Sequence, residues 1–110
     1  MINQPIKERA MNYLRVMILI PNEKELALEE ELKKVDLCCL HFMKVRGYGC
    51  NPNFYASDWS DQISKFELVI VEDQLINVKT AIKQSCQTGS ENDGILTIMP
   101  ITEKLSIKDL

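Results

Sequence analysis

The chain has 110 residues, of which 45% are hydrophobic and 26% charged, and this describes one soluble domain with a modest core. The 13 basic and 16 acidic residues give a net charge of −3 without a basic stripe, which argues against a nucleic-acid-binding protein. Residues 1–12 form a polar leader without a secretory signal, and the longest apolar run, Val16 to Pro21, is too short for insertion into a membrane. We therefore expect a cytoplasmic protein.

The first half of the chain predicts two strands around a helix. The expected elements are a strand at 13–21, a helix from Asn22, a strand at 36–46 and a long loop at 47–63. Pro21 ends the first strand because it has no N–H to donate to a ladder. Asn22-x-x-Glu25 resembles a capping box at the helix start. The expected apolar face of this helix consists of Leu28, Leu32 and Val35.

The second half predicts the same order of elements. Lys65 to Glu72 is rich in β-branched and apolar residues and indicates a strand. Glu72 and Asp73 suit the positive end of a helix dipole, and the helix that follows stops at Thr88-Gly89. Its apolar face consists of Leu75, Val78, Ile82 and Cys86. A polar turn leads to the last strand at 95–100.

Two strand–helix–strand units in series predict an α+β fold of the ferredoxin-like βαββαβ type, a four-stranded antiparallel sheet with two helices on one face. The strands are apolar on both faces, since Val16 and Ile18 alternate with Met17 and Leu19. Helices on one face leave the other face uncovered, and soluble monomers avoid such a patch. We therefore expect the chain to form an oligomer.

The cysteines are Cys38, Cys39, Cys50 and Cys86, and no C-x-x-C motif occurs. Neighbouring strand residues point to opposite faces, so Cys38 and Cys39 would separate. We interpret the cysteines as small buried hydrophobic residues rather than metal ligands. His41 is the single histidine, which excludes a histidine cluster within one chain.

Three motifs in the right order resemble the PII signalling family. Thr88-Gly89-x-x-x-Asp93-Gly94 resembles its nucleotide-binding B-loop, here residues 88–94. Val45-Arg46-Gly47-Tyr48-Gly49 resembles the V-K-G-F-G that opens its long T-loop, here residues 47–64. Leu14 to Pro21 resembles its first strand. The resemblance predicts one PII-like domain at 13–110 with a C-terminal tail at 101–110.

The resemblance implies a homotrimeric regulatory protein whose sheets face a common axis. A small effector, an adenine nucleotide, would bind in clefts between subunits and change the T-loop, which would engage a membrane transporter or an enzyme. Free backbone N–H groups of the B-loop would hold an anion. The positions that match the family's nucleotide site are His41, Gly47, Tyr48, Gly49, Cys50, Thr88, Gly89, Asn92, Asp93, Gly94 and Lys108.

Several of these positions depart from the family pattern. Cys50 and Ser106 replace arginines, and Ile95 replaces a lysine. Asn92 replaces a glycine, while Lys108 keeps the charge of the second tail arginine. Each charge-assisted contact is worth about 1.5–3 kcal/mol, so a triphosphate should bind weakly. We expect AMP, ADP or a different small anion to fit better than ATP, with a site that has lost its ligand as the alternative.

The expected T-loop contains no lysine or arginine and is rich in aromatic residues. Phe54, Tyr55 and Trp59 suit contact with a partner protein, and packing of the loop on itself is the alternative. Asn53 to Trp59 looks like the N-F-x-x-x-D-W of some divergent PII-like proteins. Ile63 stands where many PII proteins have the lysine that pairs with 2-oxoglutarate, which argues against ordinary 2-oxoglutarate sensing.

Two other readings compete with this one. A metal- or small-anion-responsive trimer of the same fold would use His41 and Cys50 from neighbouring subunits, although two ligands fall short of the usual four. A small enzyme is less favoured, because no nucleophile is paired with a base. We therefore expect no enzymatic activity.

Overall fold

The computed structural model describes residues 12–37, 39–47 and 61–110. Its strands are β1 (Tyr13–Pro21), β2 (Leu40–Gly47), β3 (Asp61–Val71) and β4 (Ile95–Pro100). Its helices are α2 (Glu25–Leu32) and α3 (Leu75–Cys86), which follow the 3₁₀ turns η1 (Asn22–Lys24) and η2 (Glu72–Gln74). A further 3₁₀ turn, η3 (Ile107–Asp109), lies in the tail. In this part of the chain no helix is both long and apolar enough to cross a membrane.

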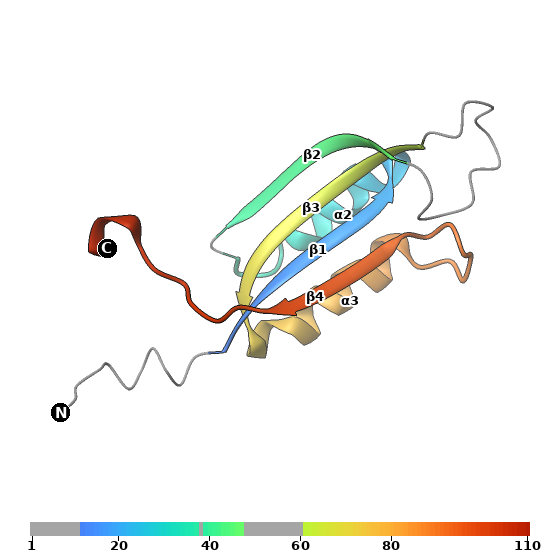
Figure 1. Ribbon diagram of the computed structural model, residues 1–110. Coiled ribbons are helices and arrows are strands. Elements are labelled where there is room, and N and C mark those ends of the chain that lie inside the picture. The colour runs from blue at the N-terminus through green and yellow to red at the C-terminus, as the bar shows by residue number, and fades with distance from the viewer. Residues whose placement is uncertain (1–11, 38, 48–60) are drawn as a thin grey trace.

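The strands form one antiparallel sheet in the order β2-β3-β1-β4. Figure 1 shows α2 and α3 together behind the sheet, so both helices cover the same face. The edge strands are β2 and β4. The strand order and the one-sided helices confirm the ferredoxin-like βαββαβ fold that the sequence predicts.

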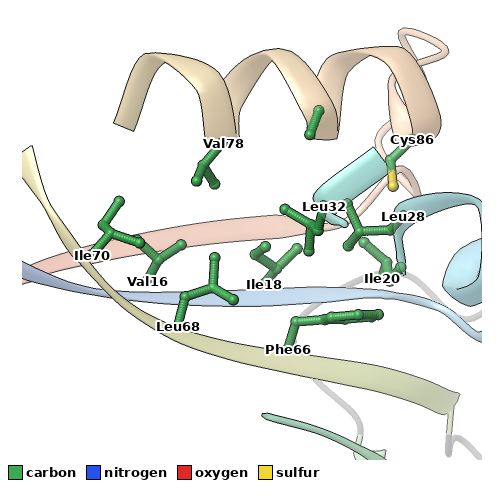
Figure 2. Packing of buried hydrophobic residues seen from close by; sticks show 11 residues of the cluster. Val16, Ile18, Ile20, Leu28, Leu32, Phe66, Leu68, Ile70, Val78 and Cys86 are labelled. Atoms are coloured by element: carbon green, nitrogen blue, oxygen red, sulfur yellow. The ribbon is translucent and has the colours of Figure 1, made fainter. Parts of the chain in front are cut away.

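The core lies between the helices and the sheet face that they cover (Figure 2). Alternate residues of the central strands point into it, because side chains along a strand alternate between faces. The buried members of the core on β1 and β3 are Val16, Ile18, Ile20, Phe66, Leu68 and Ile70. Those on the helices are Leu28, Leu32, Val78, Ala81 and Cys86. Burying each large apolar side chain contributes about 1.5–3 kcal/mol.

The first helical segment starts differently from the expectation. Asn22 belongs to η1 and its side chain caps no helical N–H, so the predicted capping box is wrong. The Ser64 hydroxyl of β3 lies 2.8 Å from Asn22 Oδ1 and 2.5 Å from Glu25 Oε1. Ser64 is fully buried, and a buried hydroxyl needs a hydrogen-bond partner. The side chains of Asn22 and Glu25 therefore bind the Ser64 hydroxyl of β3 instead of capping the helix.

The strand boundaries also differ. The strand expected from residue 36 begins at Leu40, because the Asp36 carbonyl accepts a hydrogen bond from the Gln74 side chain at η2. The strand expected from Lys65 begins earlier, at Asp61, because β2 pairs with it up to Gly47. Val35 lies beyond the end of α2, although it still packs against the core. The hairpin between β2 and β3 is therefore longer than predicted, and its loop is shorter.

The described cysteines differ in exposure. Cys86 is buried in the core, as predicted. Cys39 is exposed, and its predicted burial is wrong because it precedes β2 instead of lying within a strand. Cys38 and Cys50 lie outside the described residues.

Candidate functional site

The B-loop connects α3 to the edge strand β4. Gly89 has a φ of 92°, a left-handed conformation that glycine adopts without strain. Gly94 has a φ of 130°, and a Cβ built on it would lie 2.3 Å from the carbonyl oxygen of Leu19. The B-loop therefore packs directly against the end of β1 at Gly94.

The B-loop is closed by its own carboxylate, that of Asp93. The N–H groups of Thr88 and Gly89 donate to Asp93 Oδ2 at 2.6 and 2.9 Å. The Thr88 hydroxyl donates to Asp93 Oδ1 at 2.5 Å. These contacts favour the ionised form and lower the pKa of Asp93, the Thr88 hydroxyl most and the Thr88 N–H next.

Ser90 supplies further acceptors within the same loop. Its Oγ accepts the Asn92 N–H at 3.0 Å, and its carbonyl oxygen accepts the Asp93 N–H at 3.2 Å. The N–H groups of Thr88, Gly89, Asn92 and Asp93 are thus occupied by acceptors within the loop, so these four are not free for an anion in this structure. The physical reason is that Asp93 is itself an anion and lies inside the turn.

One acceptor in the B-loop remains open. Asn92 Oδ1 is buried and has no hydrogen-bond partner among the described residues. A buried acceptor without a partner is unfavourable.

The base of the T-loop lies at the end of the β2–β3 hairpin, where Gly47 pairs with Asp61. Gly47 is the described member of the predicted G-F-G-like motif. The other T-loop residues that the sequence singles out lie outside the described residues; they are Tyr48, Gly49, Cys50, Phe54, Tyr55 and Trp59. Their predicted roles in nucleotide and partner binding stay predictions.

The B-loop and the T-loop base lie at the same end of the sheet but at opposite edges (Figure 1). The B-loop leads into β4 at Ile95, which pairs with Leu19 near the end of β1. Gly47 ends β2, on the far side of β3 and β1. Three strand spacings separate the two edges by about 14 Å. One chain therefore does not bring these two parts of the predicted site together.

His41 lies on the sheet face that the helices do not cover. It is exposed and pairs across the ladder with Glu67 of β3. Arg15 binds Glu67 at 2.7 Å and Lys65 binds it at 3.3 Å. The pKa of Glu67 is lowered by Arg15 first and by Lys65 next. His41 therefore borders a charged cluster, which we call the Glu67 cluster and define as Arg15, Lys65 and Glu67.

The sequence analysis missed the Glu67 cluster. The signal was present, because Arg15, Lys65 and Glu67 are charged residues at alternate positions within otherwise apolar strands. Around them the same face carries partly buried apolar side chains; they include Met17, Leu19, Val69, Ile95 and Met99. The prediction of a sheet with apolar residues on both faces is thus confirmed, with a charged centre that was not predicted.

Lys108 lies far from the B-loop of its own chain. β4 begins beside the B-loop at Ile95 and ends at Pro100, at the other end of the sheet. The tail leaves from there, held by an Ile101 N–H that donates to the Tyr13 carbonyl oxygen at 3.0 Å. Figure 1 shows the tail leading away from the sheet. Lys108 can reach a B-loop only on another copy of the chain.

The described part of the molecule contains no cluster of possible metal ligands. Among residues 12–37, 39–47 and 61–110, no group of three or more His, Cys, Asp and Glu side chains is placed to hold a metal ion. His41 is described, whereas Cys50, its expected companion in the metal-responsive reading, lies outside the described residues.

Comparisons with known proteins identify the fold. No protein-family model matches this sequence, and no curated protein matches it. The structure is similar to that of B. subtilis GlnK in complex with ATP, at 24% identity and a TM-score of 0.70 over 88% of each chain. A second B. subtilis GlnK structure gives 22% identity and a TM-score of 0.65, over 83% of this chain and 86% of that chain. Arabidopsis thaliana PII bound to citrate gives 20% identity and a TM-score of 0.68, over 87% of this chain and 81% of that chain.

The fold and its B-loop define a small α+β protein of the PII structural class. The similarity spans most of both chains in each comparison, so it concerns the whole domain and not a shared fragment. The chain has the PII fold, which confirms the structural part of the resemblance seen in the sequence.

Proposed function

We propose that this chain is a regulatory protein that binds a small effector in clefts between the subunits of a homotrimer. The observation that carries the proposal is the placement of the B-loop and the T-loop base on opposite edge strands of one sheet. A cyclic assembly sets one edge of each subunit beside the other edge of the next. Such an assembly would bring the B-loop of one subunit beside the T-loop base of the next, and it would also cover the apolar sheet face.

The effector that we propose is an adenine nucleotide, with AMP or ADP ahead of ATP. The similar GlnK structure is a complex with ATP, and the similar Arabidopsis PII is bound to citrate, so ligands of this fold include anions. The preference for fewer phosphates rests on the missing cations at Cys50, Ile95 and Ser106. An anion that uses the amides of Thr88 and Gly89 has to displace the Asp93 carboxylate.

We further propose that the output passes through the T-loop. Its aromatic residues Phe54, Tyr55 and Trp59 would contact a transporter or an enzyme, since aromatic side chains dominate protein–protein contacts. The loop starts at Gly47, directly beside the proposed cleft. Occupation of the cleft would then change the conformation of the loop.

Titration calorimetry with AMP, ADP and ATP, run beside light scattering on the same sample, tests the proposal. We expect a trimer mass, and an affinity for AMP or ADP at least equal to that for ATP. Lys108→Ala should weaken a phosphate-bearing ligand by about 1–3 kcal/mol. Lys33→Ala is the matched control, because Lys33 is an exposed lysine at the end of α2 and pairs with Glu29.

Two results would contradict the proposal. A monomer mass would remove the intersubunit cleft altogether. Tight ATP binding that strengthens further with 2-oxoglutarate would instead place the protein with the nitrogen-sensing members of the fold.

A further inference from the structure

A cavity of about 300 Å³ lies on the helix-covered side of the sheet, between α3 and the edge strand β4. Its walls are mostly apolar and include Ile18, Ile20, Ile82, Cys86 and Leu96. Ile18, Ile20 and Cys86 belong to the buried core, and Ile82 and Leu96 pack against it. The volume is at the lower end of the range for small-molecule sites. The cavity is therefore a mostly apolar continuation of the core, located at the edge of the sheet.

Two lysines of α3 line the same cavity, Lys79 and Lys83. They are four residues apart and therefore neighbours on one face of the helix. Both are exposed, and neither has an ion-pair partner among the described residues. Lysines of this kind lay their methylene stems along apolar surface and keep the ammonium group in water. The entrance of the cavity is thus cationic.

The two lysines at this entrance outnumber the one acid among the described residues that line the cavity, Asp93. α3 contains no Asp or Glu, whereas α2 contains Glu25, Glu29, Glu30 and Glu31. Asp93 also lines the cavity, but its carboxylate already accepts hydrogen bonds from Thr88 and Gly89. The lysines Lys33 and Lys34 at the end of α2 are paired with Glu29 and Glu31. Lys79 and Lys83 therefore keep a net positive charge at the entrance of the cavity.

We propose that this cavity binds an amphipathic anion, an alkyl or acyl carboxylate. The chain enters between Ile82 and Leu96, and the carboxylate lies between the ammonium groups of Lys79 and Lys83. The cavity faces the helices, whereas His41 of the proposed nucleotide site lies on the opposite sheet face. The cavity shares Asp93 and Gly94 with the B-loop, so a ligand here would lie against the proposed nucleotide site. The test below uses no nucleotide, so its outcome does not depend on the proposed function.

Calorimetry with straight-chain carboxylates from hexanoate to decanoate, kept below their micelle concentrations, tests the proposal. Each CH₂ that enters an apolar site contributes about 0.8 kcal/mol, so Kd should tighten about fourfold per CH₂ until the cavity is full. Ile82→Trp should fill the cavity and abolish binding. The double variant Lys79→Gln/Lys83→Gln should weaken decanoate about tenfold, because two exposed charge contacts are lost.

The matched control is Lys33→Gln/Lys34→Gln, which removes two charges from the other helix and should leave decanoate binding unchanged. Decanol should bind equally to the wild-type chain and to the Lys79→Gln/Lys83→Gln variant. Equal affinity for decanoate and decyltrimethylammonium would overturn the proposal, as would a Kd that does not depend on chain length. It would also be overturned if no carboxylate bound. A change in mass of Ile82→Trp in light scattering would in that case identify the groove as a contact between copies of the chain. Lys79 and Lys83 lie on the surface, so their double variant should fold. It therefore still tests the proposal if Ile82→Trp fails to fold.

Discussion

Thr88 and Asp93 close the B-loop through two contacts, one from the Thr88 hydroxyl to Asp93 Oδ1 at 2.5 Å and one from the Thr88 N–H to Asp93 Oδ2 at 2.6 Å. The second oxygen also accepts the Gly89 N–H at 2.9 Å. The carboxylate thus occupies the concave side of the turn that follows α3. Removing it should disturb the loop without disturbing the core.

Asp93→Ala should leave the amides of Thr88 and Gly89 without an acceptor. We expect these two amides to lose protection from hydrogen exchange, while core amides such as that of Val78 keep theirs, since the core is not touched. Exchange measured by NMR decides the point. If Thr88 and Gly89 stayed protected in the variant, the Asp93 contacts would not be what orders the loop.

The same contacts predict how the loop responds to pH. The pKa of Asp93 is lowered below its ordinary value of 3.8, so the ionised carboxylate stabilises the folded loop above that value. This contribution is lost only as the pH falls through the lower folded pKa. The amide chemical shifts of Thr88 and Gly89 should therefore stay constant from neutral pH down to about 4 and change below it. A change centred near pH 6 would contradict the assignment.

The two left-handed glycines should respond differently to alanine. At Gly89 an added Cβ meets nothing within 4 Å, so Gly89→Ala should cost only the backbone strain, about 1–2 kcal/mol. At Gly94 the Cβ would meet the Leu19 carbonyl oxygen at 2.3 Å, so Gly94→Ala should be clearly more destabilising. Urea unfolding at one protein concentration compares the variants. Equal midpoints would mean that the loop moves away from β1 at little cost. Gly89→Ala is accordingly the better probe of ligand binding.

The uncovered sheet face should be sensitive to a buried charge. Leu19→Glu places a carboxylate opposite Lys65, which a single folded chain tolerates through an ion pair. In a trimer that buries this face, the new charge would be desolvated at a cost of several kcal/mol per ion. We expect light scattering to report monomers for Leu19→Glu. Leu26→Glu is the control, because Leu26 of α2 is 72% exposed, and it should not change the mass. An unchanged mass for Leu19→Glu would exclude this face from the interface.

The stacked rings of Phe42 and Phe66 should contribute unequally to stability. Phe66 is fully buried, whereas Phe42 on the edge strand is 43% exposed. Phe66→Ala should lower the free energy of unfolding by about 3–5 kcal/mol, as for other buried aromatic residues. Phe42→Ala should cost less than half of that, because it leaves a smaller cavity. Chemical denaturation measures both, and equal losses would contradict the burial difference.

The fold was predictable from the sequence because hydrophobic periodicity is a local signal. Val16 to Ile20 and Leu68 to Val71 are short apolar runs rich in β-branched residues, which is typical of buried strands, and Leu75, Val78 and Ile82 show helical spacing. The capping box was predicted wrongly because Asn22 and Glu25 find a stronger partner in Ser64, which is distant in sequence. The start of β3 was misplaced for a similar reason, since pairing with β2 extends it. Contacts between distant segments decide such boundaries.

The candidate site was predictable only as a set of positions. The motif T-G-x-x-x-D-G locates the B-loop, but it does not tell that the Asp93 carboxylate turns inward to the amides. Nor does it tell that His41 and Gly47 lie on the edge strand β2 whereas Lys108 lies in the tail beyond β4. The cavity beside α3 has no sequence signature, because its walls are ordinary core residues. These features depend on the three-dimensional path of the chain.

The buried hydroxyl of Ser64 fixes the register of β3 against β1, because its partners Asn22 and Glu25 directly follow β1. A strand that slides by two residues keeps every side chain on its own face, so apolar alternation leaves such slips open. A slip would move Phe66 or Gln62 to the place of Ser64 and leave Asn22 and Glu25 facing a side chain of the wrong shape or chemistry. Ser64 itself pairs with Ile20, two residues before Asn22. One small polar side chain under α2 thus sets the register in which the two central strands of the sheet pair.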